Sequence, residues 1–127
     1  MSAREEIHVS GRPELSHSAD AVRAGGFVFV AGILPVDVEG QLVGGDVDEQ
    51  TRFVLDELGR ILPAAGCAAA DVVKVTVFLT DIDDRPLINP VRQEIFGATR
   101  PASTLVEVPR LAVQGARVEI ECIALVP

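Results

Sequence analysis

The chain has 127 residues, 48% of them hydrophobic, and a formal net charge of −8 at pH 7. This length provides one domain with its own core, and the surplus of apolar residues suggests that some apolar surface is buried between subunits. Nucleic acid is not an expected partner, because 19 acidic residues outnumber 11 basic ones and no Trp or Tyr is present for base stacking.

No apolar run approaches the roughly 20 residues of a membrane-spanning helix. Residues 1–11 are polar and charged, unlike the apolar centre of a secretory signal, so the cytoplasm is the expected location. Cys67 and Cys122 lack metal-ligand spacing and are interpreted as small buried side chains rather than as a nucleophile or a disulfide pair. No metal site is predicted. No linker or internal repeat divides residues 1–127, so a single domain is expected.

The first part of the chain predicts three strands, the second of them where Ala21 and Val22 resume the apolar pattern. The alternation around Ile7 indicates a short edge strand within residues 1–12, and the Ser-, Gly- and Pro-rich residues 10–18 indicate a loop. Gly25-Gly26 then forms a turn into residues 27–33, a continuous apolar run that is typical of a central strand.

A first helix is predicted to begin after Asp46, which forms a capping box with Glu49. Pro63 weakens its last turn, and Gly66 supplies a stop. Its apolar stripe consists of Val47, Val54, Leu58, Ile61 and Leu62.

Residues 71–80 form the clearest strand, because β-branched side chains dominate them. Val73, Val75, Val77 and Leu79 are expected to share one face of this strand. A second helix is expected within residues 81–97, capped by Asp84, with Pro86 in its first turn. Pro90 removes one helical hydrogen bond, so this helix either starts irregularly or begins only at Asn89. Its apolar stripe is expected to be Leu87, Val91 and Ile95.

The last two strands are predicted at residues 105–108 and 117–126. On the second of them Val118, Ile120, Cys122 and Ala124 share one face. Glu119 and Glu121 lie on the other face, where an isolated buried charge is costly. These two carboxylates must therefore be exposed, paired or placed in a polar cleft.

The predicted fold class is α+β, in the order β-β-β-α-β-α-β-β. The architecture expected from this order is a single mixed sheet with two helices packed on one face. Two helices cannot cover both faces, and the strands are too apolar for the second face to remain wet. We therefore expect the chain to oligomerise through that face.

Several stretches together resemble the RidA/YjgF family of reactive-intermediate deaminases, also described as L-PSP-type endoribonucleases. They are AVRAGGFVFVAGILPVD at 21–37, residues 45–51, DVVKVTVFLTDIDD at 71–84, Asn89, and RPASTLVEV with VEIECIA at 100–108 and 118–124. The resemblance implies a chorismate-mutase-like fold and a homotrimer with clefts between its subunits. No cofactor is expected. In the deaminase branch, water adds to a small enamine or imine and ammonia leaves, which gives a 2-oxo acid.

The resemblance also implies roles for individual residues. Glu119 matches the glutamate that orients or activates the hydrolytic water, and Asn89 matches a polar residue near the cleft. Ala31 and Gly32 match the pair whose backbone lines the cleft. Catalysis is therefore assigned to Glu119, and substrate binding to Ser103, Thr104, Ala31, Gly32, Asn89, Ser18 and His17.

Three positions depart from the deaminase pattern. Ser103 stands where that branch has the arginine that clamps the substrate carboxylate, Ser18 stands where it has a tyrosine, and Leu105 replaces a cysteine. Losing a charged hydrogen-bond partner costs about a few kcal/mol, or on the order of a hundredfold in affinity. A free 2-imino acid should therefore bind poorly unless another arginine replaces the missing one. The candidates are Arg100, Arg110 and Arg117.

Each candidate residue also has a purely structural interpretation. Glu119 can be a solvated strand residue paired with Arg117 or with a neighbouring strand, and Ser103 and Thr104 can be ordinary residues at a strand start. His17 is either a surface histidine or an acid or base beside the cleft.

Two hypotheses of function remain open. In the first, a trimeric hydrolase acts on a small imine or enamine other than the standard 2-imino acid. In the second, a non-catalytic trimer binds a metabolite or a protein at a decayed site. Ribonuclease activity is the weakest hypothesis because of the acidic charge.

Overall fold

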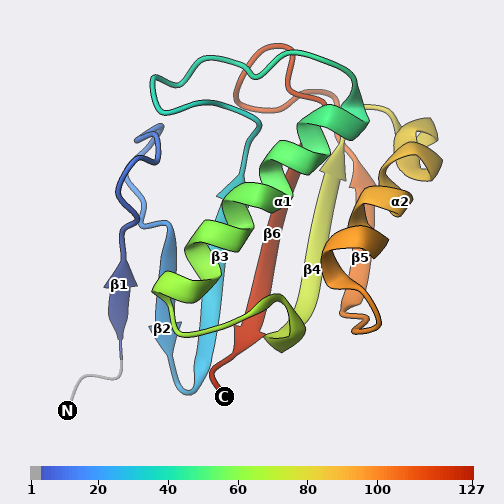
Figure 1. Cartoon of the computed structure of the whole chain (residues 1–127). Coiled ribbons are helices and arrows are strands. Elements are labelled where there is room, and N and C mark those ends of the chain that lie inside the picture. The colour runs from blue at the N-terminus through green and yellow to red at the C-terminus, as the bar shows by residue number, and fades with distance from the viewer. Residues whose placement is uncertain (1–3) are drawn as a thin grey trace.

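The computed structural model describes residues 4–127 and shows one sheet with two helices in front of it (Figure 1). The elements follow one another in the predicted order. Their bounds are β1 Glu5–Ile7, β2 Ala21–Ala24, β3 Phe27–Ile33, α1 Val47–Ala64, β4 Val72–Leu79, α2 Arg85–Phe96, β5 Ala102–Glu107 and β6 Val118–Leu125. Short 3-10 turns, η1 Ala69–Asp71 and η2 Ile82–Asp84, precede β4 and α2. The part of the predicted N-terminal segment at residues 1–3 lies outside the described residues.

The sheet has six strands in the order β1-β2-β3-β6-β4-β5. All neighbours are antiparallel except β4 and β5, which are parallel and are connected through α2. Both helices lie on one face of this mixed sheet (Figure 1). The predicted α+β, chorismate-mutase-like architecture is confirmed. None of the helices in the described part of the chain has the length and hydropathy needed to cross a membrane.

The core lies between this sheet face and the two helices. The predicted apolar face of β6 is confirmed, since Val118, Ile120, Cys122 and Ala124 are all buried. The predicted stripe of α1 is buried as well. At the start of α1, the backbone N–H of Asp46 donates to Glu49 Oε1 over 3.5 Å, and the helix ends at Ala64, just before Gly66 at φ +83°.

The prediction for β4 was wrong at Val73, which is 42% exposed. A register shift between Val72 and Lys74 in the pairing with β6 inserts one residue, so Val72 points into the core instead. From Val75 onward the predicted alternation holds. Such bulges reverse the facing of side chains on one side of the irregularity.

The second helix begins at Arg85, with Pro86 in its first turn as predicted, and not at Asn89. Asp84 precedes the helix, but its carboxylate binds the Arg117 guanidinium at 2.9 Å and does not cap the helix. The apolar stripe was wrong at Leu87, which is exposed while Ile88 is buried.

Strand β5 begins at Ala102, three residues before the predicted start at Leu105. The prediction missed this part because Ser103 and Thr104 are polar. Their backbone nevertheless pairs in parallel register with β4. The earlier start places both candidate residues inside the sheet.

The sheet face opposite the helices, here called the open face, is strongly apolar near the β2–β3 turn. Phe27 pairs with Leu125 and Phe29 with Ile123 across β3 and β6, and Phe29 is 46% exposed. The prediction that the helices leave this face uncovered within one chain is confirmed, and its occupant remains a prediction.

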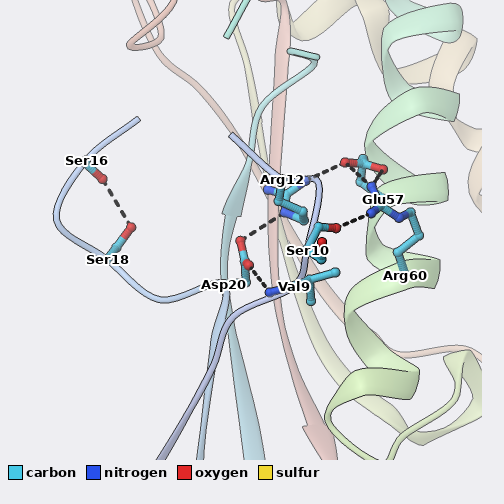
Figure 2. A network of polar contacts seen from close by, with 8 residues as sticks. All are labelled: Val9, Ser10, Arg12, Ser16, Ser18, Asp20, Glu57 and Arg60. Carbon is cyan, nitrogen blue, oxygen red and sulfur yellow. Dashed lines mark hydrogen bonds and ion pairs between the residues drawn. The ribbon is translucent and has the colours of Figure 1, made fainter. Parts of the chain in front are cut away.

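An ionic network ties the N-terminal loop to α1 (Figure 2). Arg12 donates from Nε to Asp20 at 3.0 Å and from Nη1 to Glu57 at 2.8 Å. Arg60 donates to Glu57 at 2.9 Å and to the carbonyl of Ser10 at 2.7 Å. The start of the predicted loop at 10–18 is thereby tied to Asp20 and to α1, and the hydroxyls of Ser16 and Ser18 are hydrogen-bonded to each other at 3.2 Å further along it (Figure 2).

Candidate active site

The Glu119 carboxylate lies on the open face directly against Gly32. A Cβ atom built on Gly32 would stand 2.0 Å from Glu119 Oε2. Only a residue without a side chain therefore allows this placement. The sequence places Glu119 and Gly32 far apart, and β3–β6 pairing brings them together.

Strand β3 bulges at this point. Val30 pairs with Cys122 and Ile33 with Ile120, so Ala31 and Gly32 together stand opposite Glu121. The Ala31 N–H donates to the carbonyl of Asp20 at 3.0 Å, which continues the pairing of β3 with β2. Bulges of this kind disrupt the ladder locally and expose backbone beside many active sites.

Glu119 is half-buried and has no counter-ion. Within residues 4–127, no group forms a hydrogen bond or ion pair with its carboxylate. Burial raises the pKa of the Glu119 carboxyl above its usual range, and the negative charge of Glu121 raises it further. The structural interpretation in which Glu119 pairs with Arg117 is wrong, because Arg117 binds Asp84.

Asn89 and Ser103 share a second location, at the β5 edge. They line a cavity of about 400 Å³ together with Ile82, Arg85, Arg92 and Leu105. Arg92 Nη2 donates to Ser103 Oγ at 2.7 Å. Sequence analysis did not identify Arg92, although its position three residues after Asn89 places both on one face of a helix.

Thr104 points to the opposite face from Ser103. It pairs with Thr76 on the open face, where Lys74 Nζ donates to its hydroxyl at 2.6 Å. The structure therefore does not bring Thr104 into the cavity that contains Ser103.

His17 and Ser18 lie at a third location. Together with Ala31 and Phe29 they line a cavity of about 610 Å³ beside β2 and β3. Ala31 therefore belongs both to the lining of this cavity and to the β3 bulge that Glu119 contacts. Both His17 and Ser18 are exposed.

One chain does not bring all candidate residues together. Ser103 pairs with the buried Val75 on the helix side of the sheet, whereas Glu119 pairs with Phe78 on the open face. Since the sheet separates them, a cleft that contains both types of residue needs a second copy of the chain.

The three arginines considered from sequence do not reach Ser103. Arg117 is engaged by Asp84. Arg110 lines a different cavity, formed by residues 109–117 and Thr80. Arg100 lines a cavity next to that of Ser103, together with Arg92.

Both cysteines are buried and unpaired. Burial raises the pKa of Cys122 to about 12, and it raises the pKa of Cys67 as well. A thiol with a raised pKa is a weak nucleophile at neutral pH. This supports the interpretation of both side chains as packing residues.

Comparison with known proteins defines the class to which this fold and these residues belong. The sequence model of the family Endoribonuclease L-PSP matches residues 10–126. The chain belongs to this family, which is the RidA/YjgF family indicated by its sequence.

Individual relatives match over most of their length. A RutC family protein of Pyrococcus horikoshii is 42% identical over 95% of this chain and 97% of its own. A 2-iminobutanoate/2-iminopropanoate deaminase of Bos taurus is 42% identical over 77% of this chain and 72% of its own. The crystal structure of E. coli TdcF with bound serine superposes with a TM-score of 0.87 at 34% identity, covering 95% of this chain and 98% of that one.

Proposed function

We propose that the chain hydrolyses a small imine or enamine, and that Glu119 handles the protons of the reaction. The observation that carries this proposal is the half-buried Glu119 carboxylate, which lies on Gly32 without a hydrogen-bond or ion-pair partner among the described residues. Its raised pKa makes this carboxylate a stronger base than an ordinary glutamate, which suits a group that accepts a proton and returns it. The relative from Bos taurus is named for the deamination of two small imines.

The reaction needs one base that later acts as an acid. Glu119 accepts a proton from water as the water oxygen bonds to the carbon of the C=N group, and it returns that proton to nitrogen, which gives a carbinolamine. Glu119 then takes the remaining hydroxyl proton and passes it to nitrogen as the C–N bond breaks, so an imine and one water give a carbonyl compound and ammonia. Backbone groups at the Ala31-Gly32 bulge and the polar side chains of Asn89 and Ser103 hold the substrate.

The working unit we propose is a homotrimer whose clefts lie between subunits. Two observations support an oligomer: the apolar open face, and the division of the candidate residues between two faces of the sheet. Burying exposed Phe27, Phe29 and Leu125 against another copy removes apolar surface from water. The cytoplasmic location also stays a prediction.

The substrate is a second part of the proposal. Ser103 alone disfavours a free 2-imino acid, which points to a substrate without a carboxylate or with a bulkier body. That expectation holds only if no guanidinium stands beside Ser103, and Arg92 stands there. The hydrolytic step itself does not depend on which of these substrates is used.

The direct test follows ammonia and carbonyl product from freshly generated 2-iminopropanoate and 2-iminobutanoate. We expect equal amounts of both products, and loss of release in Glu119→Gln. Glu121→Gln is the matched control, since it removes a carboxylate two residues away on the same strand. If release by Glu119→Gln equals that of the native protein, the assignment is wrong. No release from any imine would favour the non-catalytic trimer.

A further inference from the structure

Arg92 occupies an unusual electrostatic position on α2. Its guanidinium is partly buried, and burial lowers its pKa. An arginine nevertheless stays protonated at neutral pH. Among residues 4–127 it forms no ion pair, and the hydroxyl of Ser103 is the acceptor that it meets. A partly buried cation without a counter-ion is costly, so this site favours an anion.

The surroundings of Arg92 strengthen this preference. Arg85 lines the same cavity, and Arg100 lines the adjoining one together with Arg92. Neither has an ion-pair partner in the described part of the chain. By contrast, Arg4, Arg12, Arg23, Arg52, Arg60 and Arg117 are all ion-paired. In a chain of net charge −8, this edge of the sheet is locally positive.

We propose that Arg92 is the carboxylate-binding residue of the cleft, with its guanidinium oriented by the Ser103 hydroxyl. This inference deepens the proposed function, from which it takes the cleft and the reacting C=N group. The site where Ser103 replaces an arginine on β5 then still receives a guanidinium, supplied by α2. The substrate class that follows is a small acid with its imine or enamine next to the carboxylate.

The chemistry of the cavity favours a carboxylate over other anions. A guanidinium has five N–H donors in a planar fork that matches a carboxylate in two parallel hydrogen bonds. Ser103 accepts one of these donors, which leaves the rest of the fork for a ligand. Asn89 adds an amide, while Ile82 and Leu105 provide apolar walls. A small organic acid satisfies both kinds of lining.

The test measures, by calorimetry, binding of 2-oxobutanoate, which is the expected product of 2-iminobutanoate hydrolysis and does not react further. We expect Arg92→Gln to weaken binding roughly 10- to 100-fold, as for loss of a charge-assisted pair. Arg92→Lys keeps the positive charge but loses the planar fork of donors, so its affinity for 2-oxobutanoate should lie between those of the native protein and Arg92→Gln. Arg52→Gln, which removes an exposed arginine paired with Glu94 on the surface, should bind like the native protein.

A swap distinguishes binding from a structural role. Placing the guanidinium back on β5 in the double variant Arg92→Gln/Ser103→Arg should restore most of the binding. Ser103→Arg alone should bring no gain, because two guanidiniums would then compete for one position. A merely structural Arg92 would not be rescued in this way.

The inference is wrong if the native protein does not bind 2-oxobutanoate, or if Arg92→Gln binds it as tightly as the native protein does. It is also wrong if the double variant still binds 2-oxobutanoate weakly, or if inorganic phosphate binds through Arg92 as tightly as 2-oxobutanoate does. Acid binding that depends on Arg92 without imine hydrolysis would support this inference and refute the proposed function. Hydrolysis that depends on Glu119 with an unchanged KM in Arg92→Gln would do the reverse.

Discussion

The Glu119 carboxylate packs directly against the backbone of Gly32 in β3. The absence of a side chain at position 32 determines where the Glu119 oxygen lies. Any added atom at that position must push the carboxylate away or deform the bulge.

Gly32→Ala should therefore slow hydrolysis while the chain still folds. Its Cβ would stand 2.0 Å from Glu119 Oε2, and the end of the Glu119 side chain can turn away at little cost. We expect a loss of kcat of at least about tenfold, with a smaller change in thermal stability.

Gly59→Ala is the control for this substitution. A Cβ on Gly59 meets nothing within 4 Å, and the residue is exposed within α1. The change should leave kcat unchanged and stabilise the helix by about 0.5–1 kcal/mol. Equal activity of Gly32→Ala and Gly59→Ala would contradict the role given to the Glu119–Gly32 contact.

The pH dependence of kcat/KM should report the raised pKa of Glu119. The base must be deprotonated, so activity falls as pH drops through that pKa, and the acid limb should lie above the ordinary glutamate range. Glu121→Gln removes a neighbouring negative charge, so it should move the acid limb to lower pH. An acid limb that does not move would show that Glu121 does not act on the catalytic group.

The free energy of unfolding should also depend on the ionisation of Glu119, but it should fall as pH rises, whereas activity rises. Because the folded pKa of Glu119 is raised, the folded state binds the proton more tightly than the unfolded state, and stability decreases as pH rises between the two pKa values. Glu119→Gln should remove this decrease. Urea denaturation of the native protein and the variant at several pH values measures the difference.

Arg12 should be the most sensitive residue of the N-terminal loop. Its side chain is only 9% exposed and neutralises both Asp20 and Glu57. Arg12→Ala leaves the poorly solvated Asp20 carboxylate without a counter-ion and leaves Glu57 with Arg60 alone, which should cost about 3 kcal/mol of unfolding free energy. Arg52→Ala removes an exposed pair with Glu94 and should cost at most about 1 kcal/mol. Urea denaturation measures both losses of unfolding free energy. If the two variants lose similar amounts, the network around Arg12 contributes no more stability than an exposed ion pair.

Phe29→Glu should dissociate the proposed trimer. Phe29 lies on the open face beside Ile123, where a buried carboxylate would be costly. Val38→Glu is the control, since Val38 is exposed outside the sheet. Sedimentation should show a trimer for the native protein and for Val38→Glu, and smaller species for Phe29→Glu. A native monomer at micromolar concentration would refute the assembly.

Local patterns predicted most of the fold. The alternation of β6, the apolar run of β3 and the stripe of α1 each follow from the period of one element. The error at Val73 arose where a β-bulge changed that period. At Leu87 the helical period is regular, and Ile88 takes the buried position instead. Sequence spacing alone does not reveal such irregularities.

The candidate site was less predictable because it depends on contacts between distant elements. Resemblance suggested Glu119, Asn89 and Ser103 as candidates, but it did not show that the sheet separates Glu119 from Ser103. Arg92 was missed because it comes from α2, whereas the search for a replacement guanidinium considered the C-terminal arginines. Only the fold shows that Arg92 meets Ser103.

The most direct test of the central claim is the rate of 2-iminobutanoate hydrolysis by the native protein and by Glu119→Ala. We predict that the native protein releases 2-oxobutanoate well above the uncatalysed rate and that Glu119→Ala does not, although it folds. Release that is unchanged in Glu119→Ala, or absent in the native protein, would contradict the assignment of this chain as a Glu119-dependent imine hydrolase.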